Sequence, residues 1–210
     1  QIEPHDYICE INNTLSHINS ILIGHSQDMW SYISKNYFLQ KNVPGEIGSS
    51  TMPHKINPIN FENAEGNLGL ANSMFRFLSD KLTISRLQRD LSDSTVLRNL
   101  GVGFGYSLLA YENLIRGLSK LTINKSKILE DIEGAWELLA EPIQMVARKY
   151  NISNSYELLK EVTRGQSVTK KILHDLIMSL KIPKSEKDKL LSLTPKNYIG
   201  YAVDLCNDKR

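Results

Sequence analysis

The segment GEIGSSTMPHKINP at residues 45–58 carries side chains that could act on an acidic C–H bond or bind a carboxylate. Its glycine-flanked Ser49–Ser50 pair is followed by Lys55 and Asn57. A serine hydroxyl becomes a base only when nearby N–H groups or a cation stabilise its alkoxide. The backbone N–H groups of a Gly-Ser-Ser turn can form an anion-binding nest, and Lys55 adds positive charge. The residues alone also leave open a simple connector or a phosphate-binding turn, although the P-loop pattern is absent.

A second polar segment, SRLQRDLSDSTVLRN, could bind another anion. Arg86 and Arg89 precede a predicted helix whose first turns hold Ser94, Thr95 and Arg98. Ser94 and Arg98 lie four residues apart and therefore share one helical face. Helix N-termini attract anions, and an arginine side chain can bind a phosphate or carboxylate through two hydrogen bonds.

The alternative for this segment is a surface ion-pair cluster. Asp90 and Asp93 could pair with the arginines, and Ser92 or Asp93 could cap the helix. Two segments that could each bind an anion nevertheless favour a ligand with more than one negatively charged group.

The composition is that of an ordinary globular protein, with 41% hydrophobic and 23% charged residues among 210. A formal net charge of +2 is far from the basic surface typical of nucleic-acid binding. No apolar run is long enough to predict a membrane span. Cys9 and Cys206 lack metal or redox spacing and favour a reducing compartment. We therefore expect a cytoplasmic protein without nucleic-acid or membrane partners.

Three long helices dominate the predicted first part of the chain. The first would start at Pro4 and run to about residue 35, roughly 48 Å at 1.5 Å per residue. The second would span about 58–81 and the third about 93–119. The first helix shows the expected helical periodicity at Ile8, Ile11, Leu15, Ile18, Leu22, Met29 and Ile33.

Three glycines interrupt the third predicted helix at two-residue steps. Gly101, Gly103 and Gly105 cannot all lie on one face of a helix. We therefore expect close packing against a neighbouring helix to explain only some of them.

Shorter helices are predicted in the rest of the chain. Pro183 and Pro195 fit helix starts. The whole chain is predicted to be all-α, with a long-helix bundle over 1–118 that carries the loop at 45–58, and a small helical C-terminal domain over 119–210. The shorter predicted helices are 125–132, 135–150, 154–163, 168–180, 184–192 and 195–208.

The string GSSTMPHKINP closely resembles GSSxMPxKxNP, the signature of the fumarase/aspartase superfamily. SSTMPHKINPINFENAEGNLGL, SRLQRDLSDSTVLRNLGVGFGY, AWELLAEPIQ and TPKNYIG are similar to the adenylosuccinate lyase family within it. The likeness covers nearly the full chain and implies an all-helical homotetramer around a long central bundle. It implies β-elimination of fumarate from a purine nucleotide carrying a succinyl group, with no metal or other cofactor. The chain starts at Gln1 directly in a helical pattern, so we expect a piece of a longer protein, and the resemblance implies that this piece is its C-terminal portion.

The resemblance implies roles for residues in the first segment. Ser49 would be the base that removes the Cβ proton of the succinyl group. Ser50 and Thr51 would help to hold the substrate. Lys55 and Asn57 would bind the carboxylate that gains charge in the carbanion-like intermediate.

The remaining implied contacts come from three other places. Gln1 and Asn63 would touch the substrate. Arg89, Ser94 and Arg98 match contacts to the nucleotide phosphate, with Thr95 beside them. The superfamily assembles each site from three subunits, so these residues need not converge in one chain.

The family's general acid is a histidine that this chain does not supply. None of His5, His17, His25 or His174 matches it. His54, inside the signature, is expected to serve specificity or structure.

Two alternatives remain beside adenylosuccinate lyase. A sister lyase (fumarase, aspartase or argininosuccinate lyase) would share the loop. His54 stands where fumarases tend to have Gly and argininosuccinate lyases Gln, which argues against them. A non-catalytic helical scaffold is disfavoured because Ser49, Lys55 and Asn57 are intact.

Overall fold

The chain divides into two compact units, Gln1–Asn124 and Lys125–Arg210, and each is described by itself. The computed structural model describes residues 3–41, 57–87, 90–154, 156–157, 159–160 and 168–208. Helices supply nearly all the regular structure of these residues, which confirms the predicted all-α class. Of the helices in this described part, none has the length and apolar character needed to cross a bilayer.

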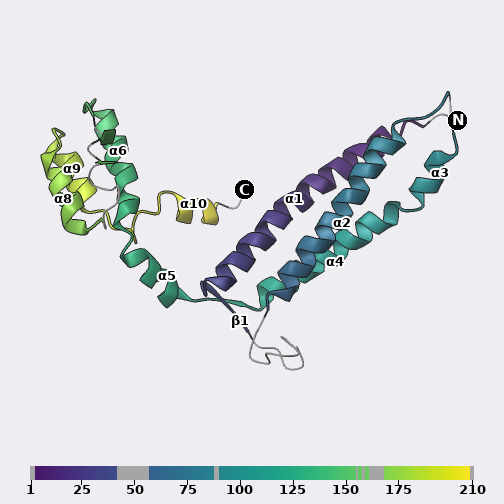
Figure 1. The fold of residues 1–210 in the computed structure, drawn as a ribbon, viewed down its shortest axis with the longest axis horizontal. Coiled ribbons are helices and arrows are strands. Elements are labelled where there is room, and N and C mark those ends of the chain that lie inside the picture. Colours follow the sequence, from purple (N-terminus) through teal and green to yellow (C-terminus); the bar gives the residue numbers. More distant parts are fainter. Residues whose placement is uncertain are drawn as a thin grey trace. The chain divides into compact units, whose positions relative to one another are not determined.

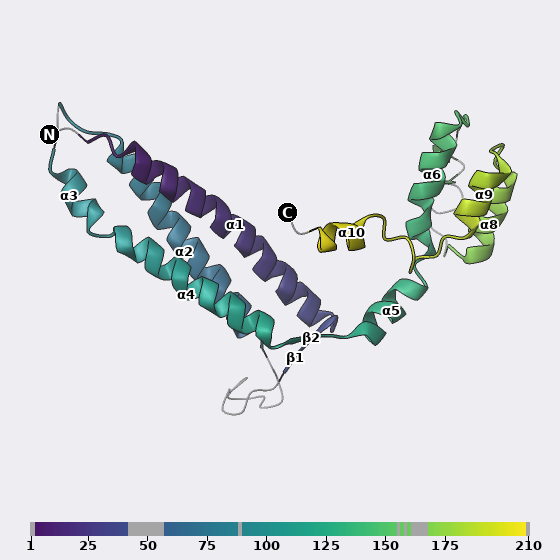
Figure 2. The ribbon, with the colours of Figure 1, turned by 180° about the vertical axis from the view of Figure 1, so that it is seen from behind.

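Three long helices build the first unit: α1 (Asp6–Ser34), α2 (Ile59–Leu82) and α4 (Leu100–Ser119). Helix α2 packs against both α1 and α4 (Figures 1 and 2). Its buried apolar residues recur in alternating steps of three and four, as in helices that pack side by side. They are Phe61, Ala64, Leu68, Ala71, Phe75, Leu78 and Leu82.

The fully buried residues of α1 are mostly polar, while Leu22, Ile23, Met29 and Ile33 are partly buried against the apolar cluster of α2 and α4. Asn19 donates from its amide nitrogen to Ser107 Oγ at 3.0 Å and accepts from the Tyr111 hydroxyl at 2.6 Å. These two bonds link α1 directly to α4. Asn12 and Ser26 lie on the same buried stripe at seven-residue steps from Asn19. The apolar periodicity of α1 therefore marks a helix without identifying its buried face.

Two glycines of α4 lie where a side chain would meet an aromatic ring of α2. A Cβ atom at Gly103 would stand 2.7 Å from the Phe75 ring, and one at Gly117 would stand 2.9 Å from Phe61. Gly101 and Gly105 face open space. This confirms that close packing explains only some of the predicted cluster.

The third predicted helix is in fact two helices, α3 (Ser92–Leu97) and α4, and the prediction of one continuous helix was wrong. The chain turns at Arg98 and Asn99, where the Asn99 N–H donates to Val96 O at 2.9 Å. Asparagine competes with the helical backbone through its own side chain and favours turns and helix starts. Here the Asn99 amide donates to Thr95 O at 3.4 Å.

A short antiparallel strand pair was not predicted. Strand β1 (Phe38–Gln40) pairs with β2 (Leu121–Ile123), with Leu39 opposite Thr122. The pairing holds residues 121–123 within the first unit. The compact units therefore divide after Asn124, later than the boundary predicted after residue 118.

The second unit contains shorter helices around an aliphatic core. Core residues include Leu139, Ile143, Leu173, Ile177 and Leu190. The helical elements are α5 (Lys125–Glu133), η1 (Trp136–Leu139), α6 (Ala140–Lys149), α8 (Lys170–Ser179), α9 (Lys184–Leu191) and α10 (Ala202–Asn207).

Two predicted helix starts at prolines were wrong. Helix α1 begins at Asp6, since His5 adopts a left-handed conformation (φ 60°) after Pro4. Pro195 lies in a turn in which the Thr194 N–H donates to Asn197 Oδ1 at 2.6 Å, and α10 begins only at Ala202. Asparagine side chains commonly close such turns. The predicted helix at 154–163 lies partly outside the described residues.

Candidate functional site

The structure describes five of the predicted site residues, all in the first unit. Ser94 and Thr95 lie in α3 and Arg98 directly follows it. Asn57 lies just before α2, and Asn63 lies near the start of α2. Gln1, Ser49, Ser50, Thr51, His54, Lys55 and Arg89 lie outside the described residues.

The turn before α3 is organised by the carboxylate of Asp90. It accepts the N–H of Ser92 at 2.8 Å and the Ser92 hydroxyl, and on the other side the N–H of Arg86 at 3.2 Å. These bonds, above all that from the Ser92 hydroxyl, lower the pKa of the Asp90 carboxyl to about 2. The turn therefore keeps a full negative charge at neutral pH.

Arg86 forms the kind of surface ion pair that the sequence analysis left open as an alternative to ligand binding. Its guanidinium lies 3.4 Å from Asp90 Oδ2, and its side chain is largely exposed. Arg98 differs. It is exposed and makes no hydrogen bond or ion pair with any residue that the structure describes. Among the described residues of this segment, Arg98 is therefore the arginine without an ion-pair partner, and Thr95 beside it is also exposed.

The start of α2 carries a pair of asparagines on one face. The amide nitrogen of Asn67 donates to Asn63 Oδ1 at 2.9 Å and to Asn63 O at 2.8 Å. Asn63 is exposed and its amide nitrogen is left as a donor. That donor suits the carboxylate or carbonyl contact that the resemblance implies.

Lys120 makes hydrogen bonds to described residues on both sides of segment 42–56, namely Lys41 and Asn60. Its carbonyl accepts the N–H of Lys41 at 2.8 Å, and its ammonium donates to Asn60 Oδ1 at 2.9 Å. The Asn60 amide in turn donates to Asn113 Oδ1 at 3.0 Å. The sequence did not single out Lys120 or Asn60, because their roles depend on a contact between residues sixty positions apart.

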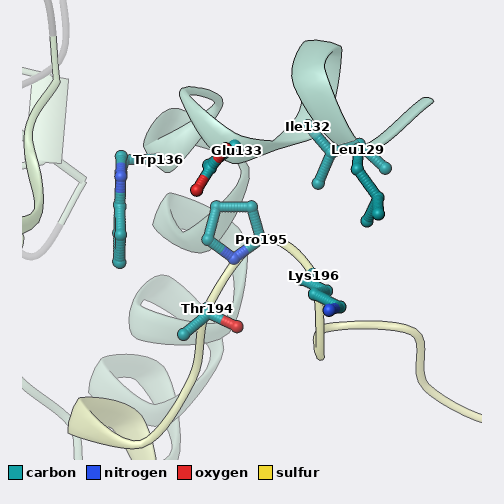
Figure 3. A pocket seen from close by; sticks show the side chains of 7 residues that line it. All are labelled: Leu129, Ile132, Glu133, Trp136, Thr194, Pro195 and Lys196. Atoms are coloured by element: carbon teal, nitrogen blue, oxygen red, sulfur yellow. The ribbon is translucent and has the colours of Figure 1, made fainter. Parts of the chain in front are cut away.

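A cavity of about 320 Å³ lies in the second unit, at the lower end of the range for ligand pockets. It is formed by the α5–η1 stretch and by the segment Thr194–Lys196 (Figure 3). Trp136 and Pro195 belong to the strings AWELLAEPIQ and TPKNYIG, so two distant motifs meet here. The cavity is lined by Leu129, Ile132, Glu133, Trp136, Thr194, Pro195 and Lys196, and includes no predicted site residue.

The chemistry available in the described residues is anion binding by cationic and amide donors. No group of three or more histidine, cysteine, aspartate or glutamate side chains with metal-binding geometry occurs in the part of the chain that the structure describes. The resemblance implies two proton-transfer groups: Ser49, which lies outside the described residues, and a histidine that none of the histidines of this chain matches.

The fold is similar to that of a class II fumarase. It matches the class II fumarase from Schistosoma mansoni with a TM-score of 0.67 and 16% identity, covering 92% of this chain and 40% of that one. The chain belongs to the family described as "Adenylosuccinate lyase C-terminal", whose model matches residues 85–199, and a model described as "Lyase" matches residues 1–71. The family resemblance drawn from the sequence is thereby confirmed.

Curated relatives named adenylosuccinate lyase match the chain almost from end to end. The protein of Vibrio cholerae is 54% identical over 98% of this chain and 45% of its own length. That of Escherichia coli K12 is 53% identical over 99% and 46%, and that of Legionella pneumophila (strain Corby) is 57% identical over 98% and 45%. The chain therefore spans a little under half the length of the curated relatives it matches.

Proposed function

We propose that the full-length protein containing this chain is an adenylosuccinate lyase. It would release fumarate from adenylosuccinate to give AMP, and from succinyl-carboxamide imidazole ribotide in purine biosynthesis. The observation that carries this proposal is the 53–57% identity, over 98–99% of the chain, to relatives named adenylosuccinate lyase. The segment SRLQRDLSDSTVLRN, which contains Arg98, is suited to binding a phosphate. It therefore favours a nucleotide substrate over a smaller dicarboxylate.

The elimination requires a base, an acid for the leaving nitrogen, and contacts at both ends of the substrate. In the proposed site Ser49 is the base, while Lys55 and Asn57 hold the carboxylate that gains charge. Ser50, Thr51, Asn63 and Gln1 supply further substrate contacts. The acid would come from the part of the full-length protein outside this chain.

The nucleotide phosphate would bind at the opposite end of the substrate. Arg98 is exposed, has no partner in the described part of the chain, and follows the helix that carries Ser94 and Thr95. An exposed guanidinium without an ion-pair partner can bind phosphate through two charge-assisted hydrogen bonds. Arg89 would add a second cation.

Self-association into a homotetramer is the proposed assembly in the cytoplasm. Each long helix of the first unit leaves apolar side chains exposed at seven-residue steps, which is the spacing of a helix-packing seam. Exposed apolar side chains that repeat along a helix in this way support an interaction with another helix. The exposed pairs are Ile11 and Ile18 on α1, Leu70 and Phe77 on α2, and Leu108 and Ile115 on α4.

The activity is tested with the full-length protein and purified adenylosuccinate, whose loss is followed by absorbance. Release of fumarate and AMP in equal amounts is the expected result. Argininosuccinate offered in parallel tests the sister-lyase alternative. A folded protein that is inactive on adenylosuccinate would overturn the proposed function.

The composite site is tested by mixing full-length Ser49→Ala, which is expected to be inactive, with Arg98→Ala after mild dissociation, and by assaying at adenylosuccinate concentrations well below the raised KM of Arg98→Ala. If Ser49 and Arg98 of different subunits serve one site, some sites in mixed oligomers are intact and activity with the KM of the unsubstituted protein appears. Mixtures whose activity stays at the sum of the two unmixed variants, although mass spectrometry detects mixed oligomers, would contradict a shared site.

A further inference from the structure

The cavity of the second unit has apolar walls that suit a flat ring. Figure 3 shows the Trp136 ring edge-on, with the other labelled side chains to one side of it, so one face of the indole is turned to the cavity. The ring of Pro195, a buried residue, supplies a second apolar surface, and Leu129 and Ile132 of α5 add aliphatic side chains. Apolar and aromatic walls with a few polar groups among them are typical of a small-molecule site.

The wall around Pro195 is fixed by contacts within the second unit. The Thr194 N–H donates to Asn197 Oδ1 at 2.6 Å, and the Asn197 N–H donates to Thr194 Oγ1 at 3.3 Å. Three residues after Pro195, burial and then the nearby Glu141 carboxylate of α6 raise the pKa of the Tyr198 hydroxyl. Because the Thr194 hydroxyl oxygen already accepts a bond, its hydrogen is left to donate to a ligand.

Glu133, the last residue of α5, carries a charge that the fold does not explain. The last turn of α5 has no basic residue, and a carboxylate at the C-terminal end of a helix opposes the helix dipole. Lys127 pairs with the neighbouring Glu130 at 3.5 Å and Asp131 at 2.8 Å. Glu133 itself makes no hydrogen bond or ion pair with any residue that the structure describes, and it lines the cavity. Its carboxylate is therefore an acceptor that is available at the cavity wall.

Lys196 brings the opposite charge to the same cavity. Its side chain is exposed and, like that of Glu133, has no hydrogen-bond or ion-pair partner in the described part of the chain. The two charges thus line one cavity without pairing with each other. A ligand with an N–H donor for the carboxylate and a negative group for the ammonium would satisfy both.

Lys170 limits the kind of ring that suits Trp136. Its ammonium lies 5.8 Å from the centroid of the Trp136 ring, and Lys170 is not one of the residues that line the cavity. A cation next to this ring disfavours a second cation, because like charges repel. A neutral aromatic ring remains favourable, since every nucleic-acid base has a face that can stack on an aromatic side chain.

We propose that this cavity binds an aminopurine nucleoside monophosphate such as AMP. The base stacks on Trp136 and contacts Pro195, and its amino group donates to the Glu133 carboxylate. A ring nitrogen accepts the hydrogen of the Thr194 hydroxyl, and the phosphate binds Lys196. The cavity volume of about 320 Å³ is within the range of small-molecule sites. The site shares no residue with the proposed active site and does not rest on the proposed function.

Equilibrium dialysis of the full-length protein with labelled AMP counts the molecules bound to each chain. Two are expected, one at the proposed active site and one in the cavity. Glu133→Ala should weaken binding in the cavity roughly tenfold, the scale of losing a hydrogen bond to a charged group. Lys196→Met should weaken it about threefold, because an exposed ion pair contributes little.

Matched controls use the same substitutions outside the cavity. Glu137 and Lys181 are exposed and do not line it, so Glu137→Ala and Lys181→Met should leave both bound molecules unchanged. Adenosine, which lacks the phosphate, should bind the cavity equally well in Lys196→Met and in the unsubstituted protein. Arg98→Ala should weaken only the molecule at the proposed active site. Circular dichroism checks that each variant is folded.

The outcomes separate the cavity from the proposed active site. A second AMP that keeps its full affinity in both Glu133→Ala and Lys196→Met would overturn the proposal. The absence of bound AMP, or a single bound AMP that is lost in Arg98→Ala alone, would also overturn it, and in the second case the proposed function stands. A single bound AMP that is weakened by Glu133→Ala but not by Arg98→Ala would support the cavity site and remove the phosphate assignment of Arg98.

Discussion

The first unit buries polar side chains between its long helices, whereas the core of the second unit is aliphatic. Asn12, Asn19 and Ser107 are almost fully buried among α1, α2 and α4. The second unit instead surrounds Leu173 and Ile177 with other aliphatic residues. The first unit also leaves apolar side chains exposed on each long helix.

The difference indicates that the two units are stabilised by different interactions. The helices of the first unit are joined by buried hydrogen bonds as well as apolar contacts, whereas the second unit is stabilised by an aliphatic core. Exposed apolar side chains do not distinguish the units, because both carry them, as at Ile18 and Met145. The first unit also carries every predicted site residue that the structure describes.

The largest effect on stability is expected in the aliphatic core. Leu173→Ala should lower the free energy of unfolding of the second unit by about 2–5 kcal/mol, because it leaves a cavity in tight packing. Asn12→Leu in the first unit should be nearly neutral or stabilising, since neither amide atom of Asn12 has a partner among the described residues. Thermal unfolding of the full-length variants measures both. A strong loss in Asn12→Leu would mean that ordered water or another partner satisfies this amide.

The largest effect on activity is expected at Ser49. Ser49→Ala should reduce kcat by at least about a hundredfold, the lower end for loss of a general base, with the fold and oligomer retained. Circular dichroism and sedimentation provide the structural check. If Ser50→Ala is the inactive variant and Ser49→Ala turns over normally, the base is the neighbouring serine.

A smaller effect separates the two proposed anion-binding segments, one around Lys55 and the other around Arg98. Lys55→Ala should mainly lower kcat, because its carboxylate partner gains charge in the transition state. Arg98→Ala should mainly raise KM, by roughly tenfold or more, because the phosphate is unchanged by the chemistry. Steady-state kinetics with adenylosuccinate measure both. An Arg98→Ala enzyme with unaltered KM would remove the phosphate assignment.

The smallest effect concerns packing within the first unit. Gly103→Ala should destabilise the protein by about 1–3 kcal/mol, since the new Cβ would overlap the Phe75 ring. Gly101→Ala, in open space on the same helix, should instead stabilise it by up to about 1 kcal/mol. Equal responses in thermal unfolding would contradict the packing of α4 against α2.

The local features of the fold could be predicted because they depend on neighbouring residues. The helices of the described chain follow from three- and four-residue apolar spacing, and α9 starts after Pro183 as expected. The strand pair β1–β2 could not be foreseen, because three-residue strands have no periodicity and pair across eighty residues. The break at Asn99 was hidden because the apolar pattern continues across it.

The sequence by itself determined the family and the helical class, and it supplied the residues of the proposed site. Both motifs, GSSTMPHKINP and SRLQRDLSDSTVLRN, consist of consecutive residues. No tertiary contact is needed to recognise them. The structure decided between the alternatives for the two described arginines: Arg86 pairs with Asp90 four residues away, whereas Arg98 has no partner among the described residues. It also decided that Asn12 and Asn19 of α1 face inward while Ile11 and Ile18 face outward. Periodicity gives each helix its stripes, but only the neighbouring helices determine which stripe is buried.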